Sequence, residues 1–221
     1  MADDQKPQLN TAVVVVNFQT PDLLSNAVAS FRSVYPAVLM LIVDNGSRDN
    51  SRKVIEGMQS RYAHTSALFL EKNIFHGPAM HRAAREVKSD FLFFLDSDTE
   101  TRRGGFLEVM LKELQEEKNL YAIGRVNHVN KRGFPAEEGT AIVLSPYMMV
   151  KREIYFTLPP FEHRGMPTLG NFSAAQQRGW VVLDFPIQEY IEHKGRGTAS
   201  LFGYGLGMRG KVEYLLNKIG L

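Results

Sequence analysis

The most informative stretch of this 221-residue chain is the segment Phe91-Leu-Phe-Phe-Leu-Asp96-Ser-Asp98-Thr-Glu100. Its five apolar residues in a row are typical of a strand that is buried on both faces, as in a parallel sheet. Two carboxylates follow one residue apart, and alternate residues of an extended chain point to the same side. The segment therefore predicts a buried strand whose carboxyl end carries Asp96 and Asp98 close together.

Three further apolar segments precede this strand at regular intervals. They are residues 12–16, 39–43 and 67–70, so the four segments start 27, 28 and 24 residues apart. Each interval has room for the crossover helix that a parallel pair of strands requires. The pattern predicts an α/β fold with a mostly parallel central sheet flanked by helices.

The intervening helices have start signals and apolar faces of their own. Thr20-Pro21-Asp22 offers an N-cap, a proline for the first helical position and an acid for the first turn. Further helices are expected after Asp49-Asn50-Ser51, at about 78–87 and over 106–114. Beyond residue 120, the strand-like segments 121–126, 141–144 and 180–185 have longer connections, which predicts a mixed C-terminal extension.

The composition excludes several classes of protein. The chain has no cysteine, which removes disulfide frameworks and thiolate metal sites and suits a cytoplasmic protein. Its formal net charge of +2 is too small to indicate a nucleic-acid-binding surface. No apolar run approaches the ~20 residues needed to cross a bilayer, and the first ten residues do not have the pattern of a targeting sequence. We therefore expect a cytoplasmic protein without a nucleic-acid partner.

The carboxylates at the strand ends indicate a candidate metal site. Ligands of open α/β sheets bind outside the carboxyl ends of the strands, where Asp96 and Asp98 are expected. Carboxylates suit a divalent cation such as Mn²⁺ or Mg²⁺, although aspartate and serine after a strand are also typical of a simple turn. Asp44 ends the second strand at the same edge, where it can accept hydrogen bonds from a base or a ribose. The following Ser47 and Asp49 belong to this site or cap the next helix.

Four blocks of the N-terminal half together resemble a known family. They are Val13-Val-Val-Val-Asn17-Phe18-Gln19-Thr20-Pro21, Val43-Asp44-Asn-Gly-Ser-Arg-Asp49, Glu71-Lys-Asn73-Ile-Phe-His76-Gly77 and Leu95-Asp-Ser-Asp-Thr-Glu100. Their order and spacing resemble the nucleotide-diphospho-sugar glycosyltransferases of the GT-A fold, in particular the large inverting family, glycosyltransferase family 2. The resemblance implies a Rossmann-like domain that binds a nucleotide-sugar.

The resemblance also implies roles for residues of the donor site. Asn17 and Phe18 would line the base pocket, and Asp44 would hydrogen-bond the base. Asn73 and Gly77 would frame the nucleotide.

The same resemblance implies a metal and diphosphate site. Asp96 and Asp98 would flank the ribose, the metal and the diphosphate. Arg82 faces the diphosphate or is an ordinary solvated helix arginine. The block His193-Lys-Gly-Arg-Gly-Thr198 resembles the histidine block that completes this site in many members, and an ordinary half-exposed histidine is the alternative for His193.

The chain departs from the family at the catalytic base. The family usually has a Glu-Asp pair at the start of the helix before Gly179, but here the segment is Pro167-Thr-Leu-Gly-Asn171-Phe. An inverting transfer needs a base within hydrogen-bond reach of the acceptor hydroxyl. Glu162, Glu137 or Glu138 is therefore expected to substitute, or the chemistry is altered or lost. Glu162 is the first choice, because it lies a few residues upstream in a loop rich in proline and glycine.

Together these features predict a single domain over residues 1–221. Residues 11–105 would form the nucleotide-sugar-binding half and residues 106–200 the acceptor and catalytic half. The predicted activity is metal-dependent transfer of a sugar, from a UDP-sugar by preference, to a saccharide or lipid-linked acceptor hydroxyl with inversion, in glycan or cell-surface polysaccharide synthesis. Two alternatives stay open, a nucleotidyltransferase and a non-catalytic relative that binds a sugar nucleotide.

The tail, residues 201–221, has an amphipathic pattern. Apolar residues gather on one face of the helix expected there, namely Met208, Val212, Leu215, Leu216 and Ile219. Such a helix packs on its own domain or on a second subunit of a homodimer, or it lies on a membrane that carries a lipid-linked acceptor. The last alternative would place the protein peripherally at the inner face of the membrane.

Overall fold

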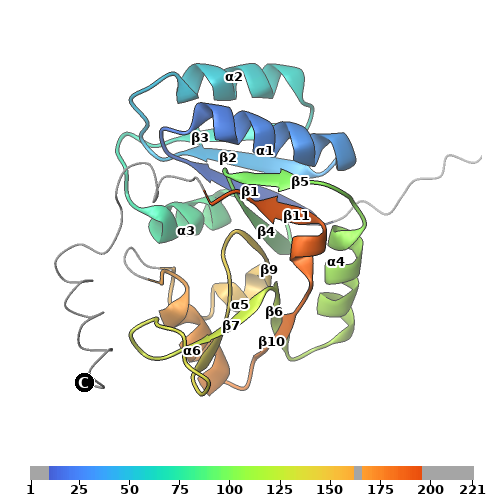
Figure 1. The fold of residues 1–221 in the computed structure, drawn as a ribbon, viewed down its shortest axis with the longest axis vertical. Coiled ribbons are helices and arrows are strands. Elements are labelled where there is room, and N and C mark those ends of the chain that lie inside the picture. The colour runs from blue at the N-terminus through green and yellow to red at the C-terminus, as the bar shows by residue number, and fades with distance from the viewer. Residues whose placement is uncertain (1–9, 162–165, 196–221) are drawn as a thin grey trace, which may run out of the picture.

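The structure, a computed structural model, describes residues 10–161 and 166–195. Its N-terminal part alternates strands and helices, as the spacing of the apolar segments predicts (Figure 1). The elements are β1 (Thr11–Asn17), α1 (Pro21–Val34), β2 (Leu39–Asp44), α2 (Ser51–Arg61), β3 (Thr65–Phe69), α3 (His76–Glu86), β4 (Phe91–Asp96) and β5 (Thr99–Thr101).

The C-terminal part is less regular. Its elements are α4 (Phe106–Glu116), β6 (Leu120–Gly124), β7 (Val126–Val129), β8 (Thr140–Val143), β9 (Tyr147–Lys151), α5 (Arg152–Tyr155), α6 (Leu169–Gln177), β10 (Val181–Asp184), the 3₁₀ helix η1 (Ile187–Glu189) and β11 (Ile191–His193). The segment 121–126, predicted as one strand, is divided between β6 and β7. Gly124 lies at the break with φ 153°, and a Cβ there would lie 2.8 Å from the carbonyl oxygen of Tyr147.

One sheet joins the two parts. Its strand order is β10–β6–β9–β4–β1–β2–β3. β9 is antiparallel to both β4 and β6, and the other neighbouring pairs are parallel. The predicted fold class is confirmed: an α/β, Rossmann-like architecture with a mostly parallel sheet and a mixed C-terminal extension.

The sheet has a hydrophobic core on each face. In β4, Phe93 and Leu95 pack in the cluster that contains α1, α2 and α4, whereas Leu92 and Phe94 pack in the cluster with α3, α5 and α6. The side chains of residues 91–95 are at most 9% exposed. Burying each large apolar side chain contributes about 1.5–3 kcal/mol. The prediction of a strand buried on both faces is therefore confirmed for β4.

β3 differs from that prediction. It starts two residues before the expected segment 67–70 and is the edge strand of the sheet, beside β2 only. Its side chains are partly exposed or exposed rather than buried. A short apolar segment of this kind does not reveal whether its strand has one neighbour or two.

Two small antiparallel ribbons flank the sheet. β5 pairs with β11, so that His193 lies opposite Thr99, and β7 pairs with β8. The first ribbon follows directly on β4 and therefore joins a late part of the chain to the acidic end of that strand. In the described residues, 10–161 and 166–195, no helix combines the length and apolar character of a membrane span.

Candidate metal and nucleotide site

Three strands of the sheet end side by side at its carboxyl edge. In the parallel register, Asn17 of β1 lies opposite Asp44 of β2, and Val16 of β1 lies opposite Asp96 of β4. Because β1 lies between β2 and β4, the acids that end these two strands flank the end of the central strand. The structure thus brings Asp44 and Asp96 to one rim.

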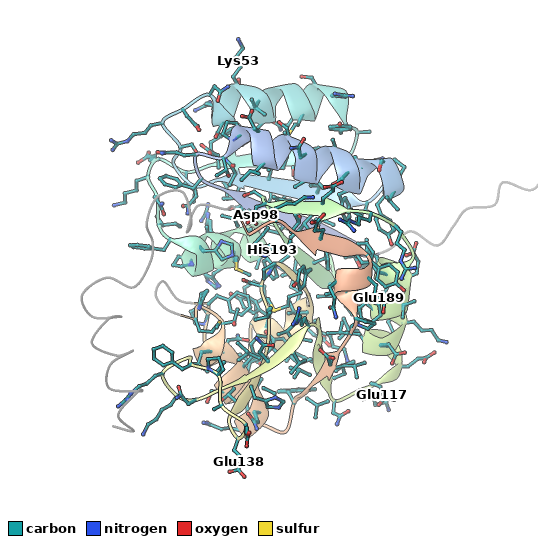
Figure 2. All side chains as sticks on the ribbon, viewed as in Figure 1. Lys53, Asp98, Glu117, Glu138, Glu189 and His193 are labelled. Atoms are coloured by element: carbon teal, nitrogen blue, oxygen red, sulfur yellow. The ribbon has the colours of Figure 1, made fainter. Side chains whose placement is uncertain are left out.

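An acid–imidazole cluster lies at this edge. We use this name for Asp96, Asp98 and His193, each of which offers a ligand atom within 4.8 Å of those of the other two. The Nε2 atom of His193 is 3.2 Å from Oδ1 of Asp98 and 3.9 Å from Oδ2 of Asp96. Figure 2 shows Asp98 and His193 next to each other in the middle of the molecule. The three predicted metal ligands are therefore brought together.

The β5–β11 ribbon positions His193. The backbone N–H of Lys194 donates to the carbonyl oxygen of Asp98 at 2.9 Å, which fixes the two strands next to the cluster. The imidazole also lies edge-on to the ring of Tyr147, with 6.4 Å between the ring centroids. Tyr147 is 5% exposed and belongs to β9. A buried aromatic and a strand ladder thus limit the orientation of His193.

The electrostatics of the cluster fit a divalent cation. Burial raises the pKa of Asp96, nearby His76 and His193 oppose this rise, and the negative charge of Asp98 adds to it. The hydrogen bond to Asp98 raises the pKa of His193, and the charges of both carboxylates act in the same direction. The negative charge of Asp98 thus contributes to both shifts, and positive charge beside the two carboxylates is favourable. Two carboxylates suit Mn²⁺ or Mg²⁺, and the imidazole favours the transition metal of the two.

A second histidine, which the sequence alone did not single out, contacts the cluster. The Nε2 atom of His76 is 3.5 Å from Oδ1 of Asp96, so each oxygen of this carboxylate has a histidine nearby. His76 is the first residue of α3, and 37% of its side chain is exposed. Its position in the Asn73–Gly77 block was the one available signal, but nothing in the sequence predicted its contact with Asp96.

A network of buried polar side chains holds the ends of β1 and β2 together. Asn17 Nδ2 lies 3.3 Å from Oδ1 of Asp44, and the backbone N–H of Ser47 donates to Oδ2 of Asp44 at 3.3 Å. Thr20 donates to Oδ1 of Asn17 at 2.9 Å and lies 3.2 Å from the hydroxyl of Ser97. The network thus reaches from Asp44 to the residue between the two acids of the cluster.

This network shows how the predicted nucleotide-binding residues are placed. Asn17 is fully buried and Asp44 is 4% exposed. Asn17 therefore contributes to the rim by holding the side chains of Asp44 and Thr20 in place. Phe18, the next residue, is partly exposed. Ser47 accepts a hydrogen bond from the backbone N–H of Gln19, whereas Asp49 accepts one from that of Ser51, the first residue of α2. Of the two, Ser47 therefore belongs to the network and Asp49 to the helix start.

The loop between β3 and α3 is attached to the loop after β2. The amide of Asn45 donates to Oδ1 of Asn73 at 3.1 Å and accepts from the backbone N–H of Ile74 at 3.0 Å. Gly46 approaches the backbone of residues 72 and 73 so closely that a Cβ would lie 2.4 Å from a carbonyl carbon. Gly77 is buried in the first turn of α3. Asn73 therefore acts as a fixed part of this rim.

The remaining predicted residues are not gathered there. Arg82 forms a salt bridge of 2.8 Å with Glu86, one turn along the exposed face of α3. Glu137 and Glu138 are exposed in the β7–β8 hairpin, and Figure 2 places Glu138 at the far end of the molecule from Asp98. Glu162 lies outside the described residues, as does the tail 201–221.

The start of α6, where the family that the chain resembles usually has a Glu-Asp pair, is closely packed. Thr168, the residue before the helix, is 1% exposed, and Asn171 is fully buried. Asn171 accepts a hydrogen bond from the hydroxyl of Tyr121 at 2.7 Å and donates one to the carbonyl oxygen of Pro159 at 2.7 Å. Both the oxygen and the nitrogen of its side-chain amide are therefore hydrogen-bonded within the protein.

Solved structures share this arrangement of sheet and helices. One is the mannosyltransferase PcManGT from Pyrobaculum calidifontis, in complex with GDP-Man and Mn²⁺, with a TM-score of 0.64, 14% identity, and 80% of this chain and 55% of that chain covered. Another is S. aureus TarS 1–349 in complex with UDP-GlcNAc, with a TM-score of 0.62, 17% identity, and 83% and 60% covered. At these identities the likeness shows the fold, which is that of the GT-A glycosyltransferases.

The sequence comparison identifies the family. The family profile described as glycosyl transferase family 2 matches residues 12–179, and the chain belongs to this family. A curated relative, the undecaprenyl-phosphate 4-deoxy-4-formamido-L-arabinose transferase of Shewanella sediminis (strain HAW-EB3), is 30% identical over 79 residues. That match covers 35% of this chain and 24% of the relative. The chain thus spans about a quarter of this relative and little more than half of PcManGT.

Proposed function

We propose that the chain transfers a sugar from a nucleotide-diphospho-sugar to an acceptor hydroxyl and depends on a divalent cation. The observation that carries the proposal is the acid–imidazole cluster at the carboxyl edge of the sheet, beside the Asn17–Asp44 pair. Ligands of open α/β sheets bind at this edge. Family membership supports the same reaction class.

The residues of the rim have distinct tasks in this proposal. Asp96, Asp98 and His193 would hold Mn²⁺ or Mg²⁺. A divalent cation supplies a Lewis acid that offsets the negative charge of the departing nucleoside diphosphate. Asp44, with Asn17 and Ser47 fixing its carboxylate, would accept hydrogen bonds from the base or the ribose.

The substrates are proposed from the relatives and from chemistry. UDP-sugars are the favoured donors and GDP-sugars are the second choice, and similar solved structures are complexes with UDP-GlcNAc and with GDP-Man. The name of the curated relative supports a lipid-linked acceptor, with a saccharide as the alternative. We propose that the reaction inverts the anomeric carbon, belongs to glycan or cell-surface polysaccharide synthesis, and takes place in the cytoplasm or at the inner face of the membrane.

Glu162 is the proposed base. A base must lie within hydrogen-bond reach of the acceptor hydroxyl. Glu138 lies at the far end of the molecule from the cluster, which favours Glu162 among the three predicted glutamates (Figure 2). Replacing Glu162 with glutamine is expected to lower transfer while leaving donor binding unchanged.

The metal site is tested by comparing substitutions of Asp98 and Asp90, two aspartates on either side of β4. Asp98→Asn removes a charge from the cluster, and Asp90→Asn removes one just before β4, at the opposite edge of the sheet. With UDP- and GDP-sugars, a mixed saccharide and lipid-phosphate acceptor panel and Mn²⁺, Asp98→Asn is expected to reduce release of nucleoside diphosphate by roughly 100-fold. Mn²⁺ binding by calorimetry should weaken in parallel, and Asp90→Asn should behave as the wild type.

The products separate this proposal from the nucleotidyltransferase alternative. Release of a nucleoside diphosphate indicates sugar transfer, whereas release of pyrophosphate indicates nucleotidyl transfer. The proposed metal site would be contradicted if Asp98→Asn transferred the sugar as fast as the wild type. It would also be contradicted if a metal chelator left transfer by the wild type unchanged.

A second candidate function is a non-catalytic sugar-nucleotide-binding protein. The observation that favours it is the start of α6, where Thr168 and Asn171 are buried and no described residue of this helix is a carboxylate. Tight binding of a nucleotide-sugar, combined with no hydrolysis or transfer across the acceptor panel, would support this alternative.

A further inference from the structure

Phe75 has a backbone conformation that normally requires glycine. Its φ is 72° and its ψ is 165°, and it immediately precedes α3. For a residue with a Cβ this region is strained, and such strain persists only where the surrounding structure over-determines it. The side chain is nevertheless a large aromatic that remains 39% exposed. A strained backbone at a partly exposed aromatic residue calls for a functional explanation.

The surrounding loops hold this conformation firmly. The backbone N–H of Phe75 donates to Oδ1 of Asn73 at 2.8 Å, and the same oxygen accepts from the amide of Asn45 at 3.1 Å. Gly46, with φ 74°, lies directly against the backbone of residues 72 and 73. The loop before Phe75 is thus fixed to the end of β2, and relaxation of Phe75 would break these contacts.

The strained residue lies between the two parts of the candidate site. Asn73 is attached to the loop that follows Asp44, and His76 contacts Asp96 at the end of β4. The chain from residue 73 to residue 76 therefore crosses the carboxyl edge from the β2 side to the β4 side, and Phe75 lies within this crossing.

We propose that the ring of Phe75 stacks on the nucleobase of the donor. The inference rests on the proposed nucleotide-sugar function and deepens it. An aromatic face suits a base because stacking requires no particular hydrogen-bond pattern, and Asp44 supplies polar contacts from the neighbouring strand end. The strain is then retained because it directs the ring toward the site.

The experiment measures stability and ligand binding in the same variants. Phe75→Gly removes both the strain and the ring, and Phe75→Leu keeps the strain and removes only the aromatic face. We expect Phe75→Gly to unfold at a higher urea concentration than the wild type and yet to bind UDP, in the presence of Mn²⁺, about tenfold more weakly. Phe75→Leu should lose UDP affinity without gaining stability.

Two controls locate the effect on the base. Mn²⁺ with pyrophosphate, a ligand without a base, should bind equally to the wild type and Phe75→Gly. Phe156→Ala, which removes another exposed phenylalanine, 41% exposed at the end of α5, should leave UDP binding unchanged.

The outcomes distinguish this inference from the function on which it rests. Wild-type affinity for UDP in Phe75→Gly, or an equal loss for UDP and pyrophosphate, would overturn the stacking role alone. If UDP does not bind the wild type, GDP replaces it as the probe, and failure of both would overturn the proposed function together with the inference.

Discussion

The two halves of the molecule place their buried polar residues differently. In residues 11–105, polar side chains gather at the carboxyl ends of parallel strands, where Asp96, Asp98 and the Asn17–Asp44 pair face a common rim. In residues 106–193, the comparable buried polar residue Asn171 has both ends of its amide bonded within the protein. The first half therefore gathers its polar groups at the rim where we propose that the donor binds, and the second half uses them to hold α6 in place.

This difference indicates which parts of the activity can be separated. Donor and metal binding should depend on the loops of the first half, whereas damage at the start of α6 should lower stability without weakening nucleotide binding. His193 is the exception, because the β5–β11 ribbon carries it from the second half into the first.

The largest expected effect concerns the close backbone contact of Gly46, in the loop after β2, with Lys72 and Asn73, in the loop after β3, which we call the clamp. Gly46→Ala places a methyl group 2.4 Å from the backbone of Lys72 at a residue with φ 74°. Because backbone cannot move aside as a side chain can, we expect a loss of about 4 kcal/mol or more in the free energy of unfolding, together with weaker UDP binding. Urea denaturation and calorimetry measure the two effects.

Gly57→Ala is the matched control for this substitution. Gly57 lies within α2, and a Cβ there meets no atom within 4 Å. Alanine is the better helix former, so this variant should be more stable by about 1 kcal/mol and bind UDP normally. Equal stability of the two alanine variants would refute the proposed clamp.

The next effect tests the second half. Asn171→Leu removes the hydrogen-bond partner of the Tyr121 hydroxyl and of the Pro159 carbonyl oxygen. Each orphaned buried group costs about 1–3 kcal/mol, so the free energy of unfolding should fall by about 2–4 kcal/mol. Nucleotide affinity at a temperature where the variant is folded should not change. A parallel loss of UDP binding would show that the two halves are not separable.

A neighbouring threonine provides the contrast. The hydroxyl of Thr168 is buried and has no hydrogen-bond partner among the described residues. Thr168→Val therefore removes an unsatisfied group at nearly constant volume, and we expect the free energy of unfolding to rise by about 1 kcal/mol. A loss comparable with that of Asn171→Leu would mean that this hydroxyl has a partner in solution.

The smallest effect lies where the two halves meet. His81 of α3 lies with Nδ1 2.8 Å from the hydroxyl of Tyr155 of α5, and burial together with Arg85 lowers the pKa of His81. At pH values between the ordinary pKa and the lowered one, the unfolded chain therefore binds more protons than the folded chain. The free energy of unfolding consequently falls as the pH decreases below about 6.5. His81→Gln cannot titrate, so urea midpoints at pH 7.5 and pH 5.5 should differ less in this variant than in the wild type. An equal difference in both proteins would exclude His81 as a contributor.

Local pattern was enough to predict the parallel half of the fold. Residues 91–95 form a continuous apolar run, and a strand of this kind must lie in a sheet that is covered on both faces. Regular intervals of 24–28 residues between such runs require crossover helices. Parallel strands then bring their carboxyl ends to one edge, which is why Asp44 and Asp96 were predicted to gather before their register was known.

The sequence alone determined that this chain has an α/β sheet with acids at its carboxyl rim, because strand burial and side-chain alternation are local properties. Tertiary structure decided the rest: the antiparallel insertion of β9, the contact of His193 with Asp98, and the contact of His76 with Asp96. These features depend on pairing between distant segments. The contact of His76 also follows Phe75, whose backbone conformation is one that sequence propensity disfavours. No periodicity within one segment can specify such contacts, since their free energy arises only when both partners are already in place.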